Sequence, residues 1–364
     1  MASFTGRQRW RQTLISIWQR FAILLLVVAV VVLGGIGVGV YALVHGFGPS
    51  VGVWTQLQKT GAPPFEENGL AGYDPQVGKQ IRCSGGPPSG TPISTWAFDR
   101  QTCTWTQLAA SGPQPTSEGL GLVYNETTGK IMRLGYSPEQ KDYDTWAYDT
   151  SANTWTDLHP TMPPPPQGVN HRPGVVALVY DPRSAQVILV GSTVTKVSTW
   201  AYDSKTNSWR ELTSNGSPPA RVQAAFAYDK SMGRLLLFGG WGHFEKAEGG
   251  LFGDTWAFDS STSTWTELKP AKSPSDRVGA TMAYDEDAGR MILAGGFSDK
   301  LLSDTWAYDS AENTWTKLRT AGSPGPRGGA SMFYDPTLHR LFMTGGKNNV
   351  PTTPMFQDCW TFSY

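Results

Sequence analysis

The sequence predicts an all-β protein, a ring of six four-stranded antiparallel sheets preceded by one transmembrane helix. Three observations support this: a composition rich in Gly, Pro and Trp, an apolar run near the N-terminus, and a cassette of about 50 residues that recurs along the rest of the chain. The predicted parts are a cytoplasmic tail (residues 1–20), a transmembrane helix (21–44), a short linker (45–52) and the ring (53–364).

The composition favours strands and short turns. The 364 residues include 41 Gly, 26 Pro and 15 Trp, and only 16% are charged. Trp, Tyr, Phe, Val and Thr suit pleated, half-buried surfaces, whereas Gly and Pro interrupt strands. Residues 1–20 contain four arginines and no acid, so the rest of the chain has a small excess of acidic residues. Such a body gives no reason to expect a nucleic-acid partner.

The apolar run extends from Phe21 to Val44 and contains no charged residue. Its length exceeds the roughly 20 residues that a helix needs to cross a bilayer. The arginines before it predict a single-pass protein of the cell membrane, with a cytoplasmic N-terminus and the ring outside the cytoplasm. A cleaved signal peptide is the alternative, but its apolar region is usually shorter, roughly 7–15 residues.

The repeated cassette reads Asp/Ser-Thr-Trp-Ala-Tyr/Phe-Asp. Five copies, and a degenerate sixth at the end of the chain, lie at Ser94–Asp99, Asp144–Asp149, Ser198–Asp203, Asp254–Asp259, Asp304–Asp309 and Asp358–Ser363. In the first five, a second tryptophan follows the first at a constant spacing and begins a Trp-x-x-Leu or similar segment. A Tyr-Asp or Tyr-Asn pair and an apolar run ending at glycine precede each cassette. One repeat therefore predicts four short strands, which we name a, b, c and d in chain order.

A single sheet of this kind cannot bury both faces, and radial stacking into a β-propeller solves that problem. The last repeat has strands a, b and c and then the chain ends. The missing strand d is predicted at Val53–Leu57, which would pair with the strand that carries Trp360 and close the ring. Closure in this way removes two exposed sheet edges.

Gly-Gly, then Asp-Thr-Trp-x-Tyr-Asp, then Trp-x-x-Leu resembles the kelch repeat over residues 51–364. The resemblance implies a ligand- or protein-binding module without a cofactor. It also implies an alternative, a carbohydrate-active enzyme similar to the six-bladed N-acetylneuraminate epimerase, with an acidic sugar as substrate. Similarity to galactose oxidase is weaker, because that enzyme has seven blades and a copper site with Tyr and His ligands. Fold resemblance alone does not transfer an activity.

The candidate binding residues lie where strand a begins. Arg221, Arg277 and Arg327 each precede the strand-a tyrosine by seven positions, and Arg172 lies one position out of that register. An arc of guanidinium groups suits a carboxylate or another planar anion. The structural alternative is that each arginine bonds neighbouring loop carbonyls. We expect Arg277→Ala and Arg327→Ala to abolish anion binding with little loss of folding if the first interpretation holds.

In the first two repeats this position is acidic or polar instead. Glu66 and Ser117 occupy it, with Glu118 following Ser117. If the protein transfers protons, Glu66, Glu67 or Glu118, opposite the arginines, is the acid expected to do so. No catalytic residue is assigned, because no hydrolase or phosphate-binding motif occurs. The carboxylates that open strand c are periodic and are expected to fix turns.

Trp241 and His243 are further binding candidates. Trp241 is the one tryptophan after the apolar run that the repeat does not explain, and a long predicted loop follows it. An exposed aromatic side chain on such a loop can stack on a sugar or fill a pocket in a partner; the alternative is packing over the blade. The five histidines are few and scattered, and Cys83, Cys103 and Cys359 are widely spaced, so no metal site is expected.

The strands also predict which face is turned outward. Strands alternate in direction, so the a–b and c–d turns share one face and the d–a and b–c connections share the other. A linker of about eight residues spans at most roughly 25 Å. It reaches strand d from the side of the c–d turns. We therefore predict that the turns lie toward the membrane and the d–a and b–c loops carry the partner site.

Overall fold

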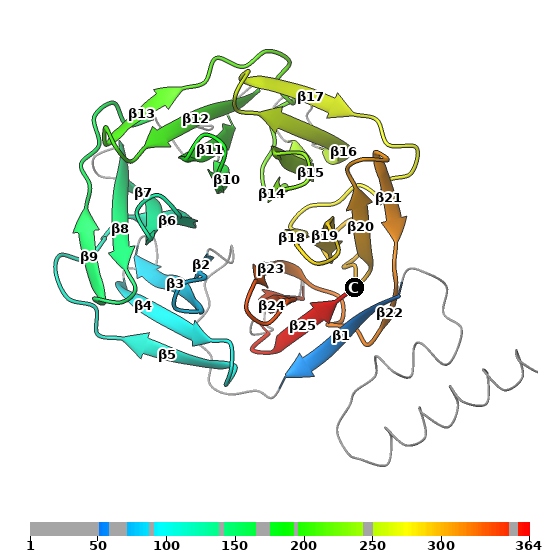
Figure 1. Cartoon of the computed structure of the whole chain (residues 1–364), viewed down its shortest axis with the longest axis horizontal. Helices are drawn as coiled ribbons and strands as arrows, with labels where there is room; N and C mark the ends of the chain where they lie inside the picture. Colours follow the sequence, from blue (N-terminus) through cyan, green and yellow to red (C-terminus); the bar gives the residue numbers. More distant parts are fainter. Residues whose placement is uncertain are drawn as a thin grey trace, which may run out of the picture.

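The computed structural model describes residues 51–57, 71–86, 91–137, 142–164, 175–192, 196–242, 250–348 and 356–364. These residues form six sheets arranged as blades around a central axis, with strand a innermost and strand d outermost (Figure 1). The all-β six-bladed propeller predicted from the repeats is confirmed. None of the described elements is a helix long and apolar enough to span a bilayer. The predicted tail, the transmembrane helix 21–44 and most of the linker lie outside the described residues.

The first five blades each contain four strands in the order a-b-c-d, and neighbours pair antiparallel. In blades 1 and 2 these are β2 (Ala71–Asp74), β3 (Lys79–Gly86), β4 (Thr91–Asp99), β5 (Thr104–Leu108), β6 (Glu118–Asn125), β7 (Lys130–Ser137), β8 (Asp142–Asp149) and β9 (Thr154–Asp157). In blades 3 to 5 they are β10 (Val175–Asp181), β11 (Gln186–Ser192), β12 (Val197–Asp203), β13 (Ser208–Glu211), β14 (Ala225–Asp229), β15 (Arg234–Gly242), β16 (Gly250–Asp259), β17 (Thr264–Leu268), β18 (Thr281–Asp285), β19 (Arg290–Ala294), β20 (Thr305–Asp309) and β21 (Thr314–Lys317).

Blade 6 joins the two ends of the propeller. Its strands a, b and c are β23 (Gly328–Asp335), β24 (Arg340–Lys347) and β25 (Cys359–Ser363), and its strand d is β1 (Val51–Leu57). β1 runs antiparallel to β25, with Trp54 opposite Phe362 and Gln56 opposite Trp360. The predicted closure by the N-terminal strand is therefore confirmed, and the strand begins slightly earlier than the sequence indicated.

A short additional strand, β22 (Arg319–Ala321), pairs parallel with the start of β1 on its outer side. Similar single bridges join the segment after strand d of one blade to the start of strand d in the next, at Ser111↔Thr154, Thr161↔Ser208 and Asn215↔Thr264. These contacts make an outer belt that links neighbouring blades. The bridged residues Ser111, Thr161 and Asn215 each lie six positions after a strand-d tryptophan. The belt was nevertheless not predicted, because these residues are polar and form no apolar alternation that would indicate a strand.

The core consists of layers between adjacent blades. Strand-d tryptophans are almost fully buried there: Trp54, Trp155, Trp209, Trp265 and Trp315 are 0–3% exposed. Each donates an indole hydrogen bond of 2.9–3.2 Å to a threonine in strand c of the preceding blade. The acceptors are Thr305, Thr95, Thr145, Thr199 and Thr255, respectively. A buried donor thus has an acceptor at each of these five seams.

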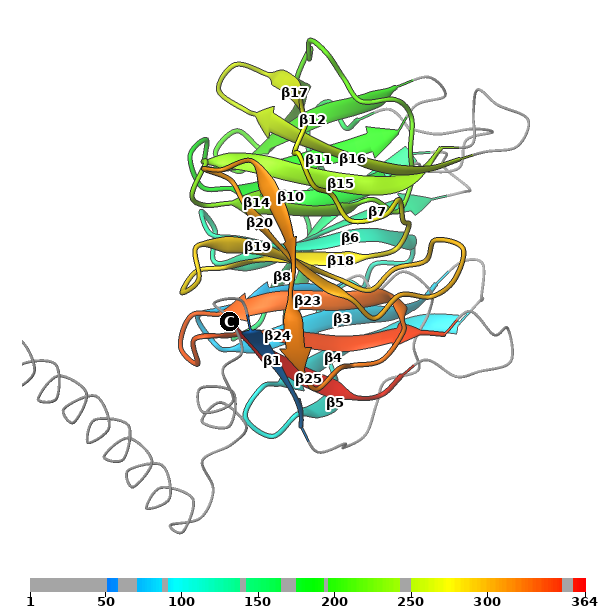
Figure 2. The ribbon, with the colours of Figure 1, turned by 90° about the vertical axis from the view of Figure 1, so that its right-hand side faces the viewer.

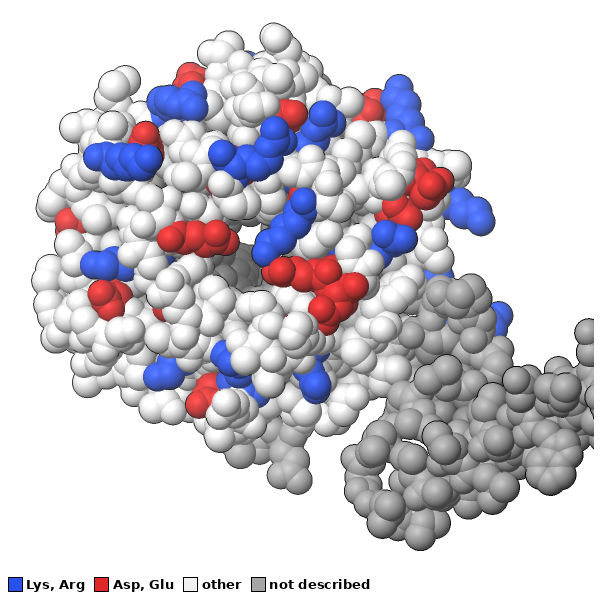
Figure 3. All heavy atoms as spheres, viewed as in Figure 1, with Lys and Arg blue, Asp and Glu red and all other residues white. Residues whose placement is uncertain are grey.

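The two ends of the propeller differ (Figure 2). We call the end with the a–b and c–d turns the turn face and the end with the d–a and b–c connections the loop face. Each described turn has four residues, and a carboxylate or amide such as Asp229 accepts backbone N–H groups within it. The C-terminus lies at the turn face. Charged side chains of both signs surround a central opening there (Figure 3). Lys230 forms an ion pair with Glu286 in the a–b turn of the next blade.

Candidate functional site

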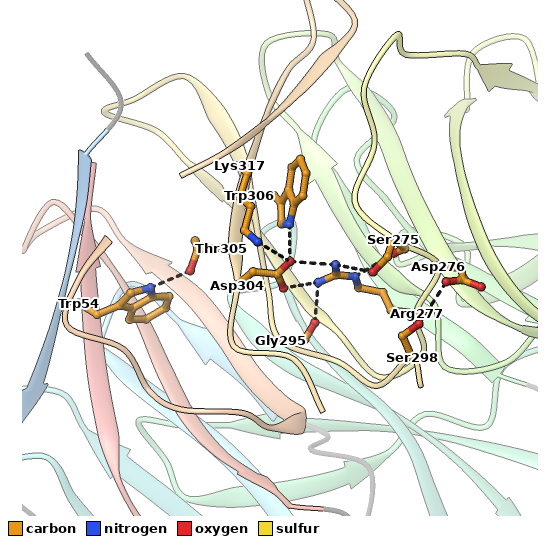
Figure 4. Close-up of polar contacts among 10 residues, drawn as sticks. All are labelled: Trp54, Ser275, Asp276, Arg277, Gly295, Ser298, Asp304, Thr305, Trp306 and Lys317. Atoms are coloured by element: carbon orange, nitrogen blue, oxygen red, sulfur yellow. Dashed lines mark hydrogen bonds and ion pairs between the residues drawn. The ribbon is translucent and has the colours of Figure 1, made fainter. Parts of the chain in front are cut away.

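Three blades carry the same cluster of Arg, Asp and Trp on the loop face. In blade 5, Arg277 precedes strand β18, while Asp304 and Trp306 lie at the start of β20 (Figure 4). Arg277 Nη1 lies 2.7 Å from Asp304 Oδ1 and Nη2 lies 3.1 Å from Oδ2, and Trp306 Nε1 donates to Oδ2 at 2.7 Å. This two-pronged pairing is the geometry that makes Arg–carboxylate contacts strong.

Blades 4 and 6 repeat this arrangement. Arg221 binds Asp254 at 2.5 and 2.9 Å, and Arg327 binds Asp358 at 2.7 and 2.8 Å. The aspartates again accept an indole N–H at 2.7 Å, from the tryptophan two positions later. The three arginines are 0–3% exposed. An aromatic ring covers two of them: Phe252 lies 3.9 Å from Arg221, and Phe356 lies 4.4 Å from Arg327.

The double glycine at the end of strand b explains how each arginine is seated. Arg277 Nη1 donates to the carbonyl of Gly295 at 3.0 Å, and the next amide, Gly296 N–H, donates to the carbonyl of Arg327 in blade 6 at 2.8 Å. Gly295 has a φ of 68°, and a Cβ there would lie 2.5 Å from the Arg327 carbonyl oxygen. Glycine is therefore required at this corner. The motif links one blade to the next through the arginine backbone.

These contacts match the structural alternative for the arginines. Their Nη nitrogens already donate to aspartates and loop carbonyls, so an anion would have to displace an aspartate to bind them. We therefore expect Arg277→Ala to destabilise the protein rather than to leave folding intact. The aspartates before strand c were expected to fix turns. Each instead bonds the start of strand c to the arginine that precedes strand a of the same blade.

Burial alone raises the pKa of Asp304 and Asp358, but hydrogen bonds from the paired arginine and tryptophan, together with the arginine charge, outweigh it. The pKa of both carboxyl groups therefore lies below the ordinary value. Both clusters are ion pairs at neutral pH.

Blade 2 builds an equivalent cluster from a different strand. Ser117 occupies the arginine position, and Arg133 from β7 fills the space: its Nη1 donates to Ser117 Oγ at 2.9 Å and lies 3.5 Å from Asp144. Arg133 is fully buried. The sequence analysis missed Arg133. The available signal was the apolar run of strand b, in which an arginine stands at a position expected to be buried.

Of the remaining candidate binding residues, the structure describes Glu118 and Trp241. Glu118 is the first residue of β6 and is partly buried. Trp241 does not lie in a free loop: β15 continues to Gly242, and the Trp241 backbone exchanges two 2.9 Å hydrogen bonds with Val222. Its ring is partly buried. Glu66, Arg172 and His243 lie outside the described residues.

The described residues contain no group of three His, Cys, Asp or Glu side chains placed to hold a metal ion. In the described parts of blades 2, 4, 5 and 6, the loop face carries Arg–Asp ion pairs that tie its connections together. Such an arrangement holds loops in fixed positions, and loops on a rigid scaffold are where binding residues usually lie.

Two comparisons place this architecture among known proteins. The structure is similar to that of a fungal alcohol oxidase of the AA5 family, solved in complex with copper, with a TM-score of 0.52 and 17% identity. The match covers 81% of this chain and 61% of the oxidase chain, less than two thirds of its length. At this identity the likeness concerns the fold. The family model described as the KLHDC2/KLHL20/DRC7 Kelch-repeats domain matches residues 183–364, half of the sequence. The chain thus belongs to the kelch-repeat family represented by this domain.

Proposed function

We propose that this chain is a membrane-tethered, extracytoplasmic kelch propeller that binds a protein partner through its loop face. Kelch propellers generally bind proteins. The observation that carries the proposal is the set of Arg–Asp–Trp clusters. They fix the connections before strand a to those before strand c, so that the loops leave a rigid frame. Preorganised loops lose little entropy on binding, which favours affinity.

The same clusters weigh against an acidic-sugar enzyme. Arg221, Arg277 and Arg327 were the groups expected to hold the substrate carboxylate, and each is buried against its own aspartate. The photo-crosslinking experiment below can still decide in favour of the enzyme alternative.

The tether and the orientation are supported by the sequence and by the position of β1. The apolar run 21–44 ends a few residues before Val51, where β1 begins. Val53 pairs with Ser363, next to the C-terminus at the turn face (Figure 2). A short linker from a membrane helix thus enters the ring from the turn face, which would leave the loop face directed away from the bilayer.

Site-specific photo-crosslinking in intact cells tests the binding face. A photoreactive amino acid replaces Lys300, exposed in the b–c connection of blade 5, or Val77, 40% exposed in an a–b turn. We expect a discrete protein adduct from position 300 and none from position 77. An adduct from position 77 alone would reject the proposed face. Absence of any protein adduct, together with thermal stabilisation of the protein by acidic sugars, would favour the enzyme.

Antibody access tests the topology separately. An epitope inserted between Asp299 and Lys300 should be bound on intact cells, and more readily than one appended to Tyr364 at the turn face. If both epitopes are reached only after permeabilisation, the extracytoplasmic location is wrong. If the C-terminal epitope is reached more readily, the orientation is wrong.

A further inference from the structure

The seam between blade 6 and blade 1 differs from the other five. At those five seams, a threonine directly before the strand-c tryptophan accepts the indole hydrogen bond described above. In blade 6 this position is Cys359, at the start of β25. It faces blade 1, whose strand-d tryptophan is Trp105. The one cysteine in the six equivalent positions therefore lies where the ring is closed.

A second cysteine stands opposite it. Cys103 is the last residue of the c–d turn in blade 1 and has a φ of 54°. The equivalent residues are asparagine or serine: Asn153, Asn207, Ser263 and Asn313. Asparagine tolerates this left-handed conformation better than most residues. Neither cysteine nor the serine of blade 4 has this advantage, so the backbone conformation does not explain the cysteine.

The two thiols meet inside the seam. Cys103 Sγ lies 3.3 Å from Cys359 Sγ, and the residues are 6% and 4% exposed. Phe98, Phe333 and Phe342 pack around them. Two positions that hold other residues in the remaining blades are thus both cysteine here, one on each side of the same interface. The two cysteines are 256 positions apart in the chain, so the segment between them contains nearly the whole propeller.

A second contact at this seam is also exceptional. On the turn face, blades 3 and 4 accept a serine hydroxyl of the next blade: Ser260 donates to Asp181 and Ser310 donates to Asp229. At the closing seam the donor is Arg100 of blade 1, which forms an ion pair with the buried Asp335 of blade 6. At this position, the seam between blade 6 and blade 1 therefore has an ion pair where blades 3 and 4 have a hydrogen bond from a serine.

We propose that Cys103 and Cys359 form a disulfide bond that covalently closes the propeller. The Sγ atoms need to approach by little more than 1 Å to reach the S–S bond length of about 2.05 Å. The oxidant is a disulfide, either a small molecule such as oxidised glutathione or the disulfide of an oxidoreductase. The two thiols lose two protons and two electrons, and the oxidant is reduced to two thiols.

The exchange takes two steps. One of the two cysteines, as its thiolate, attacks the oxidant and forms a mixed disulfide, releasing one thiol. The other cysteine then attacks the protein sulfur of that mixed disulfide, loses its proton to solvent and expels the second thiol. Contact with the Cys359 thiol lowers the pKa of Cys103, and contact with Cys103 raises the pKa of Cys359, so the two thiols titrate as an interacting pair. Cys83, in β3, is not part of the pair, and burial raises its pKa to about 11.

Thiol counting on the full-length protein in detergent tests the proposal. The protein is equilibrated in reduced and in oxidised glutathione, quenched and unfolded, and its free thiols are titrated. We expect three thiols in the reduced protein and one after oxidation. In Cys83→Ser, the number of free thiols should fall from two to none. Mass spectrometry should show the loss of two hydrogens and a peptide linking Cys103 to Cys359.

Cys359→Thr is the matched variant, because it installs the residue found in the other five blades. Oxidation should raise the melting temperature of the wild-type protein by about 5 °C or more, since the bond closes a very long loop. It should leave Cys359→Thr unchanged, with glutathione adducts at most. Three titratable thiols in the oxidised wild-type protein, or a disulfide that includes Cys83, would overturn the proposal. The thiol count and the identity of the disulfide are measured on the wild type and Cys83→Ser, so the test holds even if Cys359→Thr fails to fold.

Discussion

Replacing Arg277 with alanine distinguishes a structural arginine from one available to a ligand. Arg277 is 1% exposed and makes five hydrogen bonds, to Asp304 (two), the Gly295 carbonyl, and the carbonyl and hydroxyl of Ser275 (Figure 4). Removing one partner of a buried ion pair costs about 3–5 kcal/mol. The Asp304 side chain is 15% exposed and keeps its bond from Trp306, so we expect about 3 kcal/mol, the low end of that range.

Urea denaturation of the wild type, Arg277→Ala and the control Arg234→Ala measures this loss. Arg234 pairs with Asp259 at 3.3 Å but is 38% exposed, so its removal should cost less than about 1 kcal/mol. The double variant Arg277→Ala/Asp304→Asn should regain part of the loss, because no uncompensated carboxylate remains. If Arg277→Ala is no more destabilising than Arg234→Ala, the structural interpretation is wrong and Arg277 again becomes a candidate ligand residue.

The pH dependence provides a second check. Because the folded-state pKa of Asp304 is lowered, its ion pair stabilises the protein fully above the ordinary aspartate pKa of about 3.9. That contribution is lost as the pH falls through the lower folded-state value. The stability difference between the wild type and Arg277→Ala should therefore be constant near neutral pH and shrink below about pH 4. A difference that instead grows in acid would contradict the assignment.

Three further substitutions test the packing described above, each by thermal or urea denaturation. Burial raises the pKa of Asp285, so Asp285→Asn should stabilise the protein by about 0.5–1 kcal/mol at neutral pH. This gain should vanish in acid, because the raised pKa means that the folded protein favours the protonated carboxyl. The matched Asp229→Asn weakens hydrogen bonds from two serine hydroxyls and should destabilise the protein. Gly295→Ala should cost more than 2 kcal/mol through its clash and positive φ, whereas Gly325→Ala, with φ of 78° and open space, should cost about 1 kcal/mol; equal losses would refute the role of the clash. Thr305→Val leaves the β1 tryptophan without its acceptor and should cost about 1–2 kcal/mol, while Thr305→Ser should retain most of that stability.

The ring and its closure could be predicted because they rest on short, repeated spacings. A tryptophan in strand c and another in strand d recur with the same separation, and alternation assigns each to a face. Counting strands then required the segment around Trp54 to complete the last blade. The register with β25 confirms that conclusion.

The roles of the loop-face arginines could not be read in the same way. Arg221 and Arg277 find their aspartates 33 and 27 positions later, across b–c connections of different length. No fixed spacing marks such a pair. Arg133 reaches the equivalent place from another strand, and β15 extends past the double glycine to include Trp241. These features depend on how three chain segments meet in space, which periodicity does not encode.

The pairing of β1 with β25 has a consequence for how this protein is made. β1 leaves the ribosome about 300 residues before its partner strand, so its inner edge has no strand to bind until β25 has been made. An exposed strand edge of this kind invites pairing with other chains. Blades 1 to 5 can each assemble from contiguous sequence as they emerge, but the circle is completed in a single late step. Shielding of the nascent Val51–Leu57 segment until that step should therefore govern the yield of native protein.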